Sequence, residues 1–221
     1  MDKRVLVCSG DADNLPEIYA DLLTQFPEKA LHSYEHFEYL LRETGYRLMI
    51  LERETDRKMI GYCLSYSILG TGLVWLDYIA IRKDFQGQGC GKLLFLVLLN
   101  AYREFADGIL FPVEKIDLAD PERSPVQKRR VGFYERLGAK RLDADFRLPT
   151  IQGPCRDADL FFVPISDHYT LTARKQKDTL KMVSSLIFGD VDHSIRKACE
   201  EHSFPTLSDC GGDSPTEKSA T

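Results

Sequence analysis

The chain has 221 residues, of which 43% are hydrophobic and 29% are charged, and its formal net charge is -5. This length and apolar fraction allow one substantial core, as a single domain or a domain with an appendage. The acidic balance argues against nucleic acid as a partner, because nucleic-acid binding needs a basic face. The apolar run Leu93 to Leu99 is too short to span a bilayer, so we expect a cytoplasmic protein with no membrane partner.

The predicted elements run strand, two helices, three strands, helix, strand, helix and two strands. The expected ranges, with their types, are strand 4–10, helices 14–26 and 33–45, strands 46–54, 58–69 and 72–81, helix 91–105, strand 108–118, helix 124–138, and strands 139–148 and 158–165. This order predicts a mixed α/β fold rather than regular βαβ alternation. Pro112 inside strand 108–118 predicts an edge, a bulge or a local break there. Helix 124–138 is expected to turn Val126, Phe133, Tyr134 and Leu137 inward. Ser33 is the expected N-terminal cap of helix 33–45.

Three regions follow from the change in composition along the chain. Residues 1–166 are predicted to form the α/β domain, and residues 167–204 a C-terminal helical extension with a break near Gly189. Residues 205–221 are rich in Ser, Gly, Asp and Thr, which predicts a disordered tail. The extension could pack on the core, cover a cleft or pair two copies as a homodimer.

The six cysteines lie far apart and form no Cys-x-x-Cys pair, at Cys8, Cys63, Cys90, Cys155, Cys199 and Cys210. This spacing predicts reduced, buried thiols in a cytosolic protein. His193, Cys199, His202 and Cys210 match no tight pair of zinc ligands, so we predict no metal site.

A glycine-rich loop, "QGQGCGK" at 86–92, joins strand 72–81 to the following helix. Its G-x-G-x-G spacing does not match a dinucleotide fingerprint, and Gln86 and Leu93 stand where a Walker loop needs a glycine and a hydroxyl. The remaining pattern, Q-x-x-G-x-G before a helix N-terminus, suits a pyrophosphate such as that of coenzyme A. A turn that only connects strand to helix stays open as the alternative.

Two segments, "IAIRKDFQGQGCGKLL" and "VGFYERLGAKRL", together resemble the hallmark segments of the GNAT superfamily of N-acyltransferases. The resemblance covers roughly Val5 to Ile165 and is specific across Leu76 to Leu142. It implies a GNAT-like fold and an acyl-CoA-dependent N-acetyltransferase. Such an enzyme moves an acetyl or short acyl group from acetyl-CoA, its co-substrate, to a primary amine by direct attack.

The resemblance also implies which residues bind acyl-CoA. They are Ile79, Ala80, Ile81, Gln86, Gly87, Gln88, Gly89, Cys90, Gly91 and Lys92. The backbone N–H of Ile79 would polarise the thioester carbonyl, provided that the strand diverges from its neighbour there. Lys92 is equally well explained as a solvated lysine or as a phosphate contact.

Three candidate catalytic residues follow, Asp77, Glu114 and Tyr134. Tyr134 occupies the position of the family's acid, which protonates the leaving thiolate. Asp77 falls where several family members carry a base, and an acid in an apolar strand is costly unless it is used or paired. Glu114 could serve as base, anchor a substrate ammonium, or pair with Lys115 or an arginine of the 127–130 run.

Alternation along strand 72–81 predicts Asp77 on the same side as Trp75, Ile79 and Ile81, with Leu76, Tyr78 and Ala80 on the other. The acceptor stays open at this level. A small-molecule amine is favoured, a peptide or protein amine is the alternative, and a non-catalytic acyl-CoA-binding sensor is a third possibility on the same fold.

Overall fold

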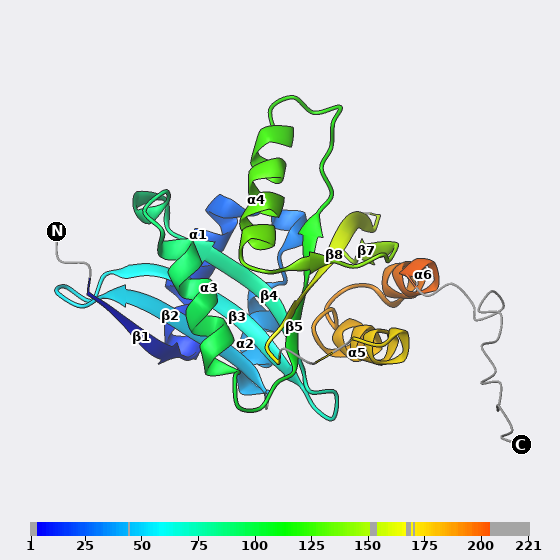
Figure 1. Cartoon of the computed structure of the whole chain (residues 1–221), viewed down its shortest axis with the longest axis horizontal. Helices are drawn as coiled ribbons and strands as arrows, with labels where there is room; N and C mark the ends of the chain where they lie inside the picture. Colours follow the sequence, from blue (N-terminus) through cyan, green and yellow to red (C-terminus); the bar gives the residue numbers. More distant parts are fainter. Residues whose placement is uncertain (1–3, 44, 151–153, 167–168, 170, 204–221) are drawn as a thin grey trace, which may run out of the picture.

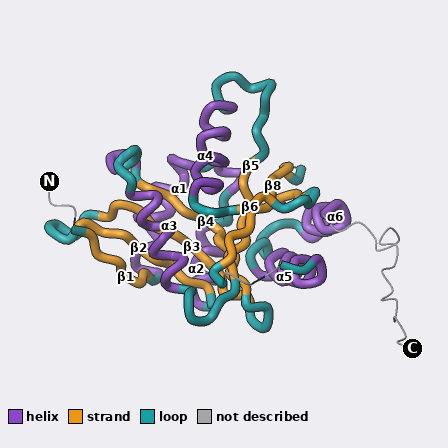
Figure 2. Tube along the Cα trace, in the orientation of Figure 1, coloured by secondary structure: helices purple, strands orange, loops and turns teal. Residues whose placement is uncertain are grey.

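A computed structural model of the chain describes residues 4–43, 45–150, 154–166, 169 and 171–203. An eight-stranded mixed sheet crosses the molecule, with helices on both faces (Figures 1 and 2). The strands are β1 (Val5–Gly10), β2 (Tyr46–Arg53), β3 (Met59–Ile68), β4 (Leu73–Ile81), β5 (Gly108–Glu114), β6 (Lys140–Arg141), β7 (Phe146–Leu148) and β8 (Arg156–Pro164). The helices are α1 (Leu15–Gln25), α2 (Tyr34–Arg42), α3 (Cys90–Ala101), α4 (Ser124–Arg136), α5 (Ala173–Leu186) and α6 (His193–Ser203).

The element order confirms the predicted mixed α/β fold. The sheet order is β1-β2-β3-β4-β5-β8-β6, with β7 also paired to β8. The expected strand 139–148 is divided into β6 and β7, which pair with different parts of β8. The α3 helix ends at Ala101, earlier than the expected 105. The predicted disordered tail, 205–221, lies outside the described residues.

The two faces of the sheet have separate apolar cores. Side chains of α1, α2 and α5 pack on one face, while those of α3 and α4 pack on the other. Ser33 caps α2 as the sequence indicates, because its hydroxyl accepts the His36 N–H at 3.1 Å. Val126 was expected inward but is 45% exposed, and Gln127 is buried in its place. The Gln127 side-chain oxygen accepts the Asp117 N–H at 2.8 Å, so a polar contact stands near the start of this helix where an apolar one was expected.

The parallel pair β4–β5 separates after three residue pairs. Leu73, Val74 and Trp75 pair with residues 108–110, and the strands then diverge (Figure 1). Antiparallel pairing of β5 with β8 continues unbroken through Glu114, so β5 is not an edge strand. Pro112 pairs with Leu160 of β8 and lies beyond the last β4 pair. The predicted local break therefore exists, and it opens only the β4 side of the strand.

A β-bulge at Asp77 overturns the predicted alternation of β4. Leu76 pairs with Ser65 and Tyr78 pairs with Leu64, so Asp77 is the extra residue. Such a bulge shifts the two-residue period of the strand. Trp75, Tyr78 and Ala80 consequently share one core, and Leu76, Ile79 and Ile81 pack in the other.

The C-terminal helices contact the body of the fold. Leu180, Val183 and Ile187 of the α5 region join the core that α1 and α2 form, and α6 lies against β7. The break near Gly189 separates α5 from α6, as predicted. The division into a 1–166 domain and a 167–204 extension stays a prediction. Within the described residues, the helices are too short or too polar to cross a membrane.

The cysteine prediction was wrong for one pair. Cys155, just before β8, and Cys199 of α6 form a disulfide with a Cα–Cα distance of 6.1 Å. They are 44 residues apart in sequence, so local spacing gave no sign of the pair. Cys8, Cys63 and Cys90 are free thiols, and Cys63 is buried. The bridge attaches α6 to the sheet.

Replacing Cys155 by Ser should lower the free energy of unfolding by about 2–4 kcal/mol, since the bridge restricts the unfolded chain. Urea unfolding without reductant would measure this loss, and Cys8→Ser, which removes a free thiol, is the matched control. Dithiothreitol should reproduce the loss in the unaltered protein and have no further effect on Cys155→Ser. Native alkylation of Cys155 without reductant would contradict the bridge.

Candidate functional site

The divergence of β4 and β5 opens a cavity of about 170 Å³. Its walls come from β4, β5, the end of α1 and the inward face of α4. Asp77, Ile79, Glu114 and Tyr134 all line it, so the structure brings the candidate catalytic residues and the expected carbonyl-binding residue to one place.

The backbone of β4 turns polar groups into this opening. The Arg82 N–H donates to the Ile60 carbonyl of the β3 side at 2.9 Å. Because neighbouring residues in a strand direct their backbone groups to opposite sides, Ile79 and Ile81 direct theirs away from β3. Ala80 lines the cavity but turns its backbone groups toward β3. The Ile79 N–H thus faces the side where β5 no longer pairs with β4.

Glycine shapes the loop between β4 and α3. Gly87 and Gly89 have positive φ angles of 74° and 84°, a left-handed conformation that residues with a Cβ rarely adopt. A Cβ on either would meet no atom within 4 Å, so the space beside both is open. Gly89 is the N-cap of α3, whose first-turn N–H groups have no intrahelical acceptor. The loop therefore offers N–H groups and the positive end of a helix dipole to an anion.

Two glutamines brace this loop. The Gln86 side-chain amide donates to the Ile81 carbonyl at 2.9 Å, and that of Gln88 donates to the Asp84 carbonyl at 2.9 Å. These bonds return the loop toward the strand and the turn before it.

A second cavity, of about 640 Å³, lies between the loop and α4. Six of the residues expected to bind acyl-CoA line it, namely Ile81, Gln86, Gly87, Gly89, Gly91 and Lys92. Sequence reasoning did not assign Phe133 and Arg136 of α4 to this wall, although their three-residue spacing places them on one helix face. Gln88 and Cys90 line a separate hollow beside Phe85 and Arg53. The structure thus divides the expected acyl-CoA set between two sides of the loop.

Tyr134 lies in an aromatic cluster at the cavity wall. Its ring centroid is 4.7 Å from that of Phe111 and 5.7 Å from that of Phe95. Burial raises the pKa of the Tyr134 hydroxyl to about 12, and the Arg130 guanidinium offsets only part of this effect. The phenol consequently remains protonated through the neutral range.

Glu114 is held in ion pairs. The Arg123 guanidinium donates to its carboxylate at 2.6 Å, and Arg156 of β8 contacts the same oxygen. These partners are neither Lys115 nor an arginine of the 127–130 run, because the chain folds other arginines against β5. Both guanidinium groups contact one oxygen of Glu114, so this carboxylate is already paired within the protein.

Asp77 belongs to a buried polar network. The Tyr46 hydroxyl donates to Asp77 Oδ2 at 2.7 Å, and His32 Nε2 lies 3.4 Å from the same oxygen. On its other side, His32 Nδ1 lies 3.2 Å from Asp190 Oδ1, in the turn between α5 and α6. The side chains of Asp77 and His32 are 5% and 3% exposed. Asp77 reaches the face that carries α2, the same face as Trp75, as the alternation along the strand predicts; the bulge changes the side only of the residues after it.

The two histidines of this network have opposite pKa shifts. Burial lowers the pKa of His32, but attraction to Asp77 and the hydrogen bond to Asp190 outweigh it and raise the value to about 9. Burial lowers the pKa of His36, whose Nε2 lies 2.8 Å from the Ile187 carbonyl. The sequence carried no spacing signal for either histidine.

His32, His36 and Asp190 bring three potential metal-ligand atoms within 4.8 Å of one another. Each atom already has a protein partner. His32 Nδ1 pairs with Asp190, and the Ile187 carbonyl can accept the proton on His36 Nε2. Asp190 Oδ2 also accepts the Ser33 N–H at 3.0 Å. These protein contacts occupy the atoms that would ligate a metal ion, so the residues do not fit a metal site well.

Known proteins resemble this chain in fold. A putative GNAT-family acetyltransferase from Bacteroides thetaiotaomicron has 17% identity and a TM-score of 0.65, covering 85% of this chain and 99% of its own. The ribosomal-protein-S18-alanine N-acetyltransferase from Escherichia coli has 20% identity and a TM-score of 0.56, covering 76% and 100%. An aminoglycoside 6'-N-acetyltransferase complexed with coenzyme A has 15% identity and a TM-score of 0.55, covering 75% and 99%. A search of curated protein sequences found no match.

The sequence match is to one family model. The model of the acetyltransferase (GNAT) family matches residues 15–139, more than half of the chain. This range runs from α1 through the glycine loop and α4 to Ala139, just after α4. The chain belongs to the GNAT family of acetyltransferases.

Proposed function

We propose that the protein is an N-acetyltransferase that transfers the acetyl group of acetyl-CoA to a primary amine by direct attack. The observation that carries this proposal is the cavity between the separated strands β4 and β5, where Asp77, the Ile79 backbone and Tyr134 meet. The proposed reaction needs a proton acceptor, an oxyanion donor and a proton donor around one carbonyl carbon. These three residues supply one group of each kind.

The donor half of the site is the glycine loop and the cavity beside it. The pyrophosphate of acetyl-CoA would be held by N–H groups from the loop and the first turn of α3, with Lys92 and Arg136 as nearby cations. A neighbour in fold is described as complexed with coenzyme A, which agrees with this role. The co-substrate's thioester end would then reach β4, where its pairing with β5 ends.

The proposed chemistry assigns one step to each group. The amine nitrogen forms a bond to the thioester carbonyl carbon while the Ile79 N–H donates to the carbonyl oxygen. Asp77 accepts the proton that the amine loses, directly or through water. The carbon–sulfur bond breaks, and the Tyr134 hydroxyl gives its proton to the sulfur. The raised pKa of Tyr134 keeps this proton available at neutral pH.

A small amine is the acceptor that the cavity favours. Its volume of about 170 Å³ is below the roughly 300–1,000 Å³ of pockets that enclose whole drug-sized ligands. Four elements surround it, and an extended peptide would need an open groove instead. The acceptor would insert its amine-bearing end beside Asp77.

An acceptor screen tests this proposal. Release of free CoA should appear with members of a panel of small primary amines and be weaker with lysine peptides. Asp77→Asn should lower kcat/KM about 10²- to 10⁴-fold, because the amide cannot accept the proton. Glu114→Gln is the matched control and should lower it far less, because that carboxylate is already paired. Full activity of Asp77→Asn with every productive amine would refute the assigned base.

Gly89→Ala should weaken CoA binding about tenfold. The added Cβ has open space, but the positive φ costs about 1–2 kcal/mol and would distort the N–H groups that receive the pyrophosphate. Gly70→Ala is the matched control, because Gly70 also has positive φ and open space, in the turn between β3 and β4. Calorimetric titration with CoA measures both. Equal affinities for Gly89→Ala and Gly70→Ala would contradict the loop assignment.

Tyr134→Phe should keep the fold and lose about 10²-fold or more in kcat, since the ring contacts remain while the proton donor is removed. Single-turnover measurements at saturating acetyl-CoA would isolate this step. Phe133→Leu, which alters the wall of the donor cavity, should change the KM for acetyl-CoA more than kcat. A Tyr134→Phe enzyme with unaltered kcat would exclude the phenol as the acid.

A further inference from the structure

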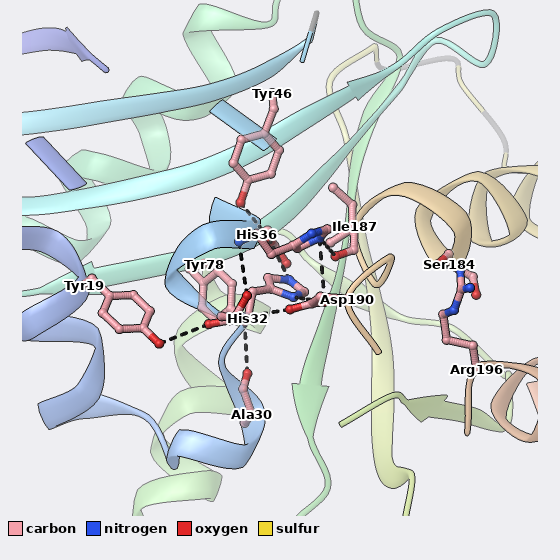
Figure 3. A network of polar contacts seen from close by, with 12 residues as sticks. Tyr19, Ala30, His32, His36, Tyr46, Tyr78, Ser184, Ile187, Asp190 and Arg196 are labelled. Atoms are coloured by element: carbon pink, nitrogen blue, oxygen red, sulfur yellow. Dashed lines mark hydrogen bonds and ion pairs between the residues drawn. The ribbon is translucent and has the colours of Figure 1, made fainter. Parts of the chain in front are cut away.

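A buried line of polar groups connects the turn between α5 and α6 to Asp77. Figure 3 shows Asp190 of that turn directed toward the imidazole rings of His32 and His36. Asp190 Oδ1 lies 3.2 Å from His32 Nδ1, and His32 Nε2 lies 3.4 Å from Asp77 Oδ2. Asp190 and His32 are 158 residues apart in sequence, so the contact exists only in the folded chain.

Both contacts to Asp77 fall on the same carboxylate oxygen. The Tyr46 hydroxyl donates to Oδ2 at 2.7 Å, and His32 Nε2 approaches Oδ2 as well. Among the residues that the structure describes, Oδ1 has no such partner, and Asp77 lines the cavity between β4 and β5. Both contacts therefore hold the same oxygen of Asp77, and Oδ1 is the oxygen that they leave without a partner among the described residues.

An imidazolium at His32 would separate the two carboxylates of this line and offset their repulsion. The Asp77 and Asp190 side chains are 5% and 11% exposed, and two carboxylates at this depth repel each other unless a cation lies between them. His32 has a carboxylate against each ring nitrogen. Its ring packs against Phe37, Tyr78 and Phe188, which exclude water from it.

The turn that carries Asp190 is itself held firmly. Asp190 Oδ2 accepts the N–H of Ser33, the cap of α2, at 3.0 Å. A Cβ on the neighbouring Gly189 would lie 3.3 Å from the His36 ring, so the turn approaches α2 closely. Phe188 contacts both His32 and Trp75. The position of Asp190 is thus set by several contacts besides the one to His32.

We propose that Asp190 and His32 are positioning residues for Asp77, holding its Oδ2 so that Oδ1 faces the acceptor amine. The C-terminal segment after residue 166 would therefore complete the acceptor side of the site, although it lies beyond the family match at 15–139. This inference rests on the proposed function, because it assumes that Asp77 is the proton acceptor.

The arrangement has a defined pH dependence. The groups around His32 are Asp77 and Tyr78 of β4, Asp190 of the turn, His36 of α2 and Tyr46 of β2. The pKa of His32 is raised from 6.5 to about 9, so its attraction to the carboxylates is fully present below pH 6.5. It is lost as the pH rises through about 9.

Asp190→Asn tests the positioning role. The substitution keeps the shape of the side chain and removes its charge, so the pKa of His32 should fall and Asp77 should lose its imidazolium partner at a lower pH. We expect kcat to fall about 10- to 100-fold with the KM for acetyl-CoA unchanged, and the alkaline limb of the kcat profile to move to lower pH. A purely structural role would leave the pH profile in place.

Asp192→Asn is the matched control on the same turn. Asp192 is exposed, its carboxylate accepts the N–H and the hydroxyl of Ser194, and asparagine can keep both bonds. This variant should retain the kcat and the pH profile of the unaltered enzyme. A shift as large as that of Asp190→Asn would overturn the proposal, because it would trace the effect to the turn rather than to the carboxylate.

Two measurements keep the test decisive if Asp190→Asn does not fold. NMR titration of the His32 imidazole in the unaltered protein should give a pKa near 9, and a value of 6.5 or below would overturn the proposal. Stoichiometric metal in the purified protein, ligated by His32 and Asp190, would also overturn it.

Asp77→Asn separates this inference from the proposed function. If Asp77→Asn is inactive while Asp190→Asn has a normal kcat and pH profile, the positioning role fails and the proposed function stands. If Asp77→Asn is fully active, the proposed base fails first. If both variants lose activity, combining them should add little to the loss in Asp77→Asn, because the two residues act on one step.

Discussion

The separation of β4 from β5 after three residue pairs is the constraint on which the rest of the site depends. Paired strands would satisfy their backbone groups and leave no space between them. Once they diverge, the β4 backbone at Ile79 faces an opening, and side chains of both strands can line it. Pro112 lies on the stretch of β5 beyond that pairing. Because proline has no backbone N–H, the opening leaves no unsatisfied donor at Pro112. The helix α4 closes the opening with Tyr134.

Electrostatics then distinguishes the two acids that face the cavity. Arg123 and Arg156 neutralise Glu114, while Asp77 has a histidine and a tyrosine at one oxygen. The two arginines contact one oxygen of Glu114, whereas the contacts of Asp77 fix the orientation of its carboxylate. In the positioning that we propose, the cation beside Asp77 depends on Asp190, so the proposed acceptor side would be built from β2, β4, the residues before α2 and the turn after α5. The proposed donor side is more local, because one glycine loop and the start of α3 would supply most of it.

The sequence predicted the order of elements, the cap at Ser33 and the break at Gly189, because each follows from the residues of one short segment. The glycine loop and the "FYERLG" motif also identified the family. The predicted alternation along β4 was wrong for the residues after Asp77, because a bulge changes the phase of a strand and depends on its pairing with β3. The partners of Glu114 and the Cys155–Cys199 bridge were missed, because arginines 123 and 156 and the second thiol come from other parts of the fold.

By itself the sequence determined the α/β fold, the family and the position of the glycine loop between strand and helix, since local periodicity and a compact motif encode all three. Only the tertiary structure decided how Asp77 is held. Tyr46 of β2 and His32, just before α2, contact Asp77, and Asp190 of the turn before α6 contacts His32; nothing in the sequence spacing relates these residues. Contacts between buried charges are set by how the helices pack on the sheet, and that packing joins residues that the sequence separates by 158 positions.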